Sequence, residues 1–193
     1  MNKRNQLRLL TLIGALAPLS AMAHTGHQVA GFFQGLLHPL SGADHLLVML
    51  AVGLMAAGYS KSRVGTAVPA AFLLAMVVGT LLAVGGLTVP FVEQGIVVSV
   101  MAAGVLLALA VRFTLIAGMV VAAGFALFHG LAHGAELPLA ANPVAYIAGF
   151  MIMTSILLVA GTRLGQLLKC YILEHHNRIS GVAVAAFGVL SAV

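Results

Sequence analysis

The chain has 193 residues, of which 62% are hydrophobic and only 7% are charged, and its mean hydropathy is +1.13. A soluble domain carries roughly 25% charged residues, so the composition excludes an ordinary soluble protein and predicts a polytopic membrane protein. The formal net charge of +5 does not indicate nucleic-acid binding, because the basic residues are scattered singly and form no patch.

Residues 1–23 have the pattern of a secretory signal peptide. A positively charged start precedes an apolar stretch at 9–19, and Ala21-Met22-Ala23 forms a small-residue cleavage site. The apolar stretch is shorter than the roughly 20 residues that a spanning helix needs. Cleavage after Ala23 is therefore predicted, and it leaves residues 24–193 as a single membrane domain.

Six apolar segments follow the predicted signal. Most approach the length that crosses about 30 Å of hydrocarbon, and lipid offers the backbone no hydrogen-bond partners, so each is expected to be a helix. The fold class is therefore all-α with six transmembrane helices. The first segment is short, and residues 29–37 can form a further helix before a break at His38-Pro39. The segments are 44–59, 64–87, 94–111, 113–133, 143–162 and 179–193.

The basic residues predict the orientation of these helices. A mature N-terminus in the periplasm places the loops after the first, third and fifth helices in the cytoplasm. Those loops contain every basic residue of the mature chain, as the positive-inside rule requires, so we expect a location in the bacterial inner membrane. The residues are Lys61, Arg63, Arg112, Arg163, Lys169 and Arg178.

One cluster of ionisable residues ends the fourth segment. His129 and His133 are four residues apart, so their rings share one helix face, and Glu136 follows about one turn later. Two imidazoles and a carboxylate at this spacing suit one divalent ion. The structural alternative is a pair of interfacial histidines at a helix end. Gly130 and Gly134 have the spacing that lets membrane helices approach closely.

The other cluster opens the first segment. Asp44 and His45 begin the apolar run, and the turn-forming Ser41-Gly42 lets His38 fold back toward them. A broken helix that lines a cavity is where transporters often hold ions. Asp44 could instead be an ordinary acid at a helix start, but ionisable groups are costly in a membrane and are usually functional there.

Other candidate groups are less specific. His24 and His27 would lie beside the free amine of the cleaved chain, and Glu93 precedes the third segment on the outer side. These three residues are predicted accessory metal ligands. Imidazole and carboxylate without a thiolate cluster favour Ni, Co, Zn or Fe over Cu(I). We expect the metal as cargo, with no permanently bound cofactor.

Both clusters resemble known motifs. His-Pro-Leu-Ser-Gly-Ala-Asp-His at 38–45 and Phe-His-Gly-Leu-Ala-His-Gly-Ala-Glu at 128–136 are similar to the two motifs of the HupE/UreJ family of hydrogenase and urease accessory proteins. The resemblance covers essentially the whole chain. It implies a secondary permease that takes up nickel, or cobalt, for metalloenzyme maturation or cobalamin synthesis. It also implies metal-handling roles for His38, Asp44, His45, His129, His133 and Glu136.

Two other functions compete with a permease. An intramembrane metalloenzyme would also use an open site of histidine and carboxylate, and a haem carrier would use axial histidines on facing helices. No further histidine box occurs in the remaining segments, and acids beside both histidine clusters argue against haem. We therefore expect a transporter and not an enzyme. Its partners are a divalent ion and the lipid bilayer, and a homo-oligomer is left open.

Overall fold

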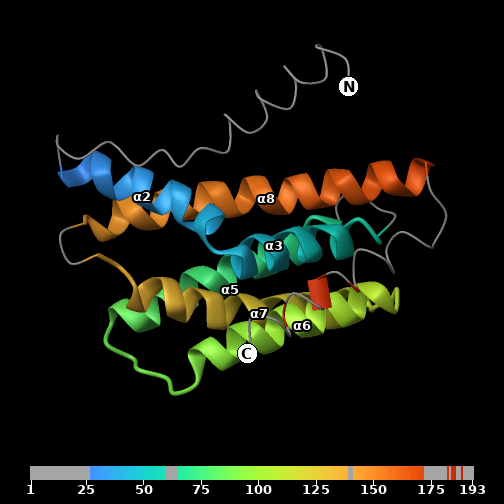
Figure 1. Ribbon diagram of the computed structural model, residues 1–193, viewed down its shortest axis with the longest axis horizontal. Coiled ribbons are helices and arrows are strands. Elements are labelled where there is room, and N and C mark those ends of the chain that lie inside the picture. The colour runs from blue at the N-terminus through green and yellow to red at the C-terminus, as the bar shows by residue number, and fades with distance from the viewer. Residues whose placement is uncertain are drawn as a thin grey trace, which may run out of the picture.

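The computed structural model describes residues 27–59, 65–138 and 141–171, together with Val182, Val184, Ala185 and Gly188. Within these ranges the chain forms six helices and no strand, which confirms the predicted all-α class. The helices lie side by side along the long axis of the molecule (Figure 1). They are α2 (His27–Ser41), α3 (Ala43–Ala56), α5 (Ala67–Val84), α6 (Val92–Ala108), α7 (Leu115–Ala135) and α8 (Pro143–Tyr171).

Three of these helices are long and apolar enough to cross a membrane, namely α5, α7 and the Pro143–Leu168 part of α8. α2 and α3 pass the same test as a pair, although a bend of 78° separates them. Large apolar side chains such as Leu74, Ile116 and Val144 are exposed on the outside of the bundle, as a lipid-facing surface requires. The chain is a membrane protein.

The predicted signal peptide and His24 lie outside the described residues, and segment 179–193 lies largely outside them. The count of six transmembrane helices therefore remains a prediction. α6 has 17 residues and is apolar but shorter than the spans named above.

Polar side chains mark the starts of α7 and α8. The Thr114 hydroxyl accepts a hydrogen bond from the Ala117 N–H at 3.3 Å. The Asn142 side-chain oxygen accepts from the N–H groups of Val144 and Ala145 at 3.0 and 3.1 Å. These caps satisfy donors that the first helical turn leaves free. α8 then runs 29 residues, well beyond the predicted end at 162, and it contains Arg163, which was predicted to lie in a loop.

The boundary between α2 and α3 differs from the predicted one. Pro39 does not end the helix at His38, because α2 continues through it to Ser41. A proline near a helix end removes only one backbone hydrogen bond, and the Ser41 hydroxyl donates to the His38 carbonyl at 2.6 Å. The break falls at Gly42, whose extended φ and ψ of −103° and 119° separate the two helices.

α2 and α3 together follow α8 in the same direction. A Cβ atom added to Gly35 would meet the backbone of Tyr146, and one added to Gly53 would meet that of Gly161. The two short helices therefore lie one after the other along α8 (Figure 1). The predicted helix at residues 29–37 is confirmed as part of α2, and the predicted segment 44–59 begins one residue after the start of α3.

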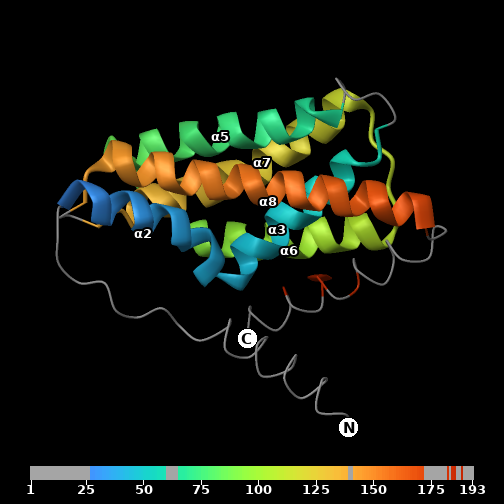
Figure 2. The same ribbon diagram turned by 90° about the horizontal axis from the view of Figure 1, so that it is seen from above.

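α5 and α7 run parallel and in close contact. A Cβ atom on Gly130 would meet the Met76 backbone, and one on Gly134 would meet Thr80. The close approach that the glycine spacing predicted is thus confirmed. The connections alternate between the two ends of the bundle: the α5–α6 loop and the α7–α8 loop lie at the end where α2 begins (Figures 1 and 2). That alternation agrees with the predicted topology.

Candidate metal site

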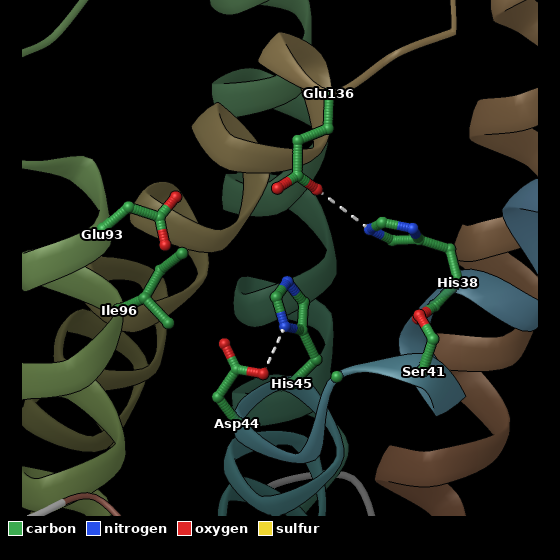
Figure 3. A pocket seen from close by; sticks show the side chains of 8 residues that line it. His38, Ser41, Asp44, His45, Glu93, Ile96 and Glu136 are labelled. Atoms are coloured by element: carbon green, nitrogen blue, oxygen red, sulfur yellow. Dashed lines mark hydrogen bonds and ion pairs between the residues drawn. The ribbon is translucent and has the colours of Figure 1, made fainter. Parts of the chain in front are cut away.

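A pocket of about 260 Å³ lies at the break between α2 and α3. Figure 3 shows its lining side chains, which come from both of these helices, from the first turns of α6 and from the end of α7. Three of the four acidic residues of the chain line this one pocket. The lining residues are His38, Ser41, Gly42, Asp44, His45, Glu93, Ile96 and Glu136.

Two imidazole–carboxylate contacts organise the pocket (Figure 3). His38 Nε2 lies 3.2 Å from Glu136 Oε2, and His45 Nδ1 lies 3.0 Å from Asp44 Oδ1. The hydrogen bond with His38 holds the pKa of Glu136, which lies just beyond the end of α7, below its ordinary value. The Glu136 carboxylate is therefore negatively charged at neutral pH and can attract a cation.

Three histidines converge behind this pocket. One ring nitrogen each of His38, His45 and His133 can be chosen so that all three atoms lie within 4.8 Å of one another. The His133 ring is fully buried and stacks on Phe150, with ring centroids 4.8 Å apart and planes inclined by 20°. Three imidazole nitrogens around one point, with an open side toward water, match the ligand set of an open transition-metal site. We call these three residues the histidine cluster.

Several buried ring nitrogens have no hydrogen-bond partner among the described residues. They are His45 Nε2, His129 Nε2 and both ring nitrogens of His133. His45 Nδ1 approaches Asp44 at 3.0 Å without hydrogen-bond alignment. Leaving a buried polar group unsatisfied costs about 1–3 kcal/mol. A neutral imidazole offers one lone pair, so a divalent cation could take one nitrogen each from rings such as His45 and His133, and the donor set fits a metal ion.

The structure brings together all six residues that the sequence singled out as principal ligands. The His45 ring lies 4.7 Å from the His133 ring and 5.0 Å from the His129 ring, centroid to centroid. The two motifs therefore meet in space as predicted, while metal binding itself stays a prediction. Of the accessory candidates, Glu93 lines the pocket, His24 lies outside the described residues, and His27 is described only as the first residue of α2.

The histidine cluster lies against the last turn of α7 and about two turns from the start of α8. Phe150, on which His133 stacks, is in the eighth position of a helix that begins at Pro143. At a rise of 1.5 Å per residue this contact is about 10 Å inside the start of α8. Sequence reasoning also missed Tyr146 and Phe150, whose rings lie against His38 and His133. Their four-residue spacing on α8 could have indicated one shared face.

Gly42 keeps the acid and the imidazole of the first motif in place. A Cβ atom at this position would lie 2.7 Å from Asp44 Oδ1 and 2.8 Å from His45 Nδ1. Gly42→Ala is therefore expected to displace both side chains and to weaken metal binding about 10- to 100-fold, the usual range for groups that orient ligands. The affinity of the purified variant and of the original protein for nickel measures this effect.

Gly124→Ala is the matched control for that experiment, because a Cβ atom there meets nothing within 4 Å. It should leave nickel affinity unchanged. Equal affinities of the Gly42→Ala and Gly124→Ala proteins would show that the close packing at Gly42 does not position the site.

Comparison with known proteins gives a consistent identification. The family model described as HupE / UreJ protein matches residues 10–191. Protein HupE of Rhizobium leguminosarum bv. viciae is 39% identical over 182 residues, which are 94% of this chain and 95% of that protein. No solved structure matches the chain significantly. The family match and the full-length relative confirm the resemblance carried by the two motifs, and the chain belongs to the HupE/UreJ family.

Proposed function

We propose that this protein is a permease that carries a divalent transition-metal ion, nickel or cobalt, across the bacterial inner membrane into the cytoplasm. The observation that carries the proposal is the histidine cluster beneath an acid-lined pocket at a helix break. Family membership supports it. In this account the metal serves the maturation of urease or hydrogenase, or the synthesis of cobalamin.

The ligand chemistry favours these ions over others. Imidazole nitrogens suit nickel, cobalt and zinc, whereas magnesium and calcium prefer oxygen ligands. The chain has only one cysteine, so it cannot build a thiolate cluster of the kind that selects Cu(I). A site of three imidazoles with carboxylates nearby is also weaker than a closed four-ligand site, which suits an ion that must be released.

Capture and dehydration follow from the order of groups along the pocket. Glu93, Asp44 and Glu136 line the pocket that precedes the buried histidines, and negative charge in a cleft raises the local concentration of cations. The ion would exchange its water ligands for imidazole nitrogens at the histidine cluster. Because the pocket lies toward the end where α7 finishes and α8 begins (Figure 3), the predicted topology makes it accessible from the periplasm.

The membrane potential is a sufficient driving force for this transport. A divalent ion that moves inward gains about 4.6 kcal/mol per 100 mV, twice the value of about 2.3 kcal/mol for one charge. Because each 1.4 kcal/mol corresponds to a factor of ten, this energy supports roughly 10³-fold accumulation. The sequence contains no ATP-binding motif, in agreement with a secondary carrier.

Uptake of radiolabelled nickel and cobalt into vesicles that contain the purified protein tests the proposal. We expect uptake when an inside-negative potential is imposed and only slow uptake when the potential is collapsed. Vesicles with the Asp44→Ala protein are the control, and they should take up little metal. Uptake that does not depend on the potential would contradict the proposed mechanism. So would an Asp44→Ala protein that takes up as much metal as the unaltered protein.

A further inference from the structure

His129 is set apart from the histidine cluster although it contacts one member. Only His38, His45 and His133 form the cluster with ring nitrogens within 4.8 Å of one another among the described residues. His129 is fully buried, whereas the pocket is lined by His38 and His45 and by neither histidine of α7. On α7, His129 lies one turn further than His133 from the pocket residue Glu136.

The hydrogen bond of His129 fixes which of its nitrogens is available. Its Nδ1 lies 2.9 Å from the Phe125 carbonyl oxygen. A carbonyl can only accept, so Nδ1 carries the hydrogen and the neutral ring has its lone pair on Nε2. That Nε2 atom is buried without a partner. Holding one ring nitrogen on a carbonyl while the other is free is the arrangement by which proteins orient histidines as metal ligands.

His45 connects His129 to the histidine cluster. Its ring centroid lies 4.7 Å from that of His133, 5.0 Å from that of His129 and 5.9 Å from that of His38. His129 and His133 are one turn apart on α7, about 6 Å along the helix axis. An ion held by the cluster could therefore reach His129 without leaving His45.

We propose that His45 and His129 form a second, deeper cation position, into which the ion moves from the histidine cluster while it stays bound to His45. This inference rests on the proposed transport function and divides it into two steps. The deeper position has two imidazole ligands in place of three, so it binds the ion more weakly. An ion that passes from a stronger to a weaker position is released more readily toward the inside, as conduction through successive sites requires.

The test separates metal binding from metal movement. His129→Phe keeps an aromatic ring against His45 but removes the lone pair, and His129→Gln serves if the phenylalanine protein does not fold. We expect nickel binding by the purified variant to stay within about threefold of the original affinity. The maximal rate of potential-driven nickel uptake should fall at least about tenfold, with the half-saturating concentration unchanged.

His133→Phe is the matched variant, because it removes a ligand of the histidine cluster by the same substitution. It should lose nickel binding as well as uptake. With cobalt as a spectroscopic probe, the visible absorption of the bound ion should be unchanged by His129→Phe and abolished by His133→Phe.

Two results would overturn the two-position arrangement. One is a His129→Phe protein that loses nickel binding as fully as the His133→Phe protein, which would mean a single shared site. The other is a His129→Phe protein with the original uptake rate, which would mean that His129 takes no part. Failure of the unaltered protein to bind or carry nickel would be a different result, since it would refute the proposed function itself.

Discussion

Replacing His45 by alanine should reduce metal uptake more than any other single histidine substitution, by at least about a hundredfold, since it removes a ligand rather than a group that orients one. The His45 ring contacts the rings of His38, His129 and His133. It also lines the pocket, which His129 and His133 do not. The initial rate of nickel uptake by cells, at equal amounts of membrane-inserted protein, measures the effect.

His176→Ala is the control for this experiment. The sequence places His176 in the segment predicted to face the cytoplasm, which lies outside the described residues. We expect its uptake to match that of the unaltered protein. A His45→Ala protein that still takes up nickel at half the original rate would show that the histidine cluster is not on the transport path.

The second large effect concerns the packing that holds α2 against α8. A Cβ atom on Gly149 would meet the Phe32 carbonyl and would lie 2.7 Å from the Leu36 nitrogen, both backbone atoms of α2. A leucine there cannot be accommodated by side-chain movement, so Gly149→Leu should force the two helices apart. Overpacking of this kind costs typically 1–3 kcal/mol and occasionally more. At about 2–4 °C per kcal/mol, the midpoint of thermal unfolding should fall by roughly 2–12 °C.

Gly124→Leu is the matched comparison, because its Cβ atom would enter open space on α7. Leucine is also a better helix former than glycine, by up to about 1 kcal/mol. The unfolding midpoint of this variant in detergent should be unchanged or slightly higher. Equal midpoints for the Gly149→Leu and Gly124→Leu proteins would show that the contact between α2 and α8 does not limit stability.

Much of this arrangement could be predicted from the sequence, because two of its determinants involve residues that are close together along the chain. Apolar length defines the spanning helices, and four-residue spacing places His129 and His133 on one face of α7. The meeting of the two motifs could also be predicted, since both were assigned to the same membrane side. Their contact through His45 then follows from close helix packing.

The exact position of the helix break at the site could not be predicted in the same way. Pro39 suggested a break at His38, but a proline is tolerated near a helix end, and the break depends on Gly42. Whether α2 continues the span or lies at the surface is decided by its contact with α8, which involves residues more than 100 positions away, such as Gly35 and Tyr146. Hydropathy along the chain carries no information on such a contact.

The separate role that we propose for His129 was equally hidden in the sequence. Its spacing from His133 suggested two equivalent ligands. The difference between them arises from the hydrogen bond of His129 to the Phe125 carbonyl and from the position of His133 beside His38 and His45. Neither of these has a pattern of its own in the sequence.

The position of a bound nickel ion tests the central claim most directly. Anomalous X-ray diffraction from crystals of the protein loaded with nickel would locate the metal. The account predicts a peak about 2 Å from one ring nitrogen each of His38, His45 and His133, the usual length of a bond from imidazole to such a metal. A nickel peak that is bound elsewhere in the protein, with no density among these three rings, would contradict it.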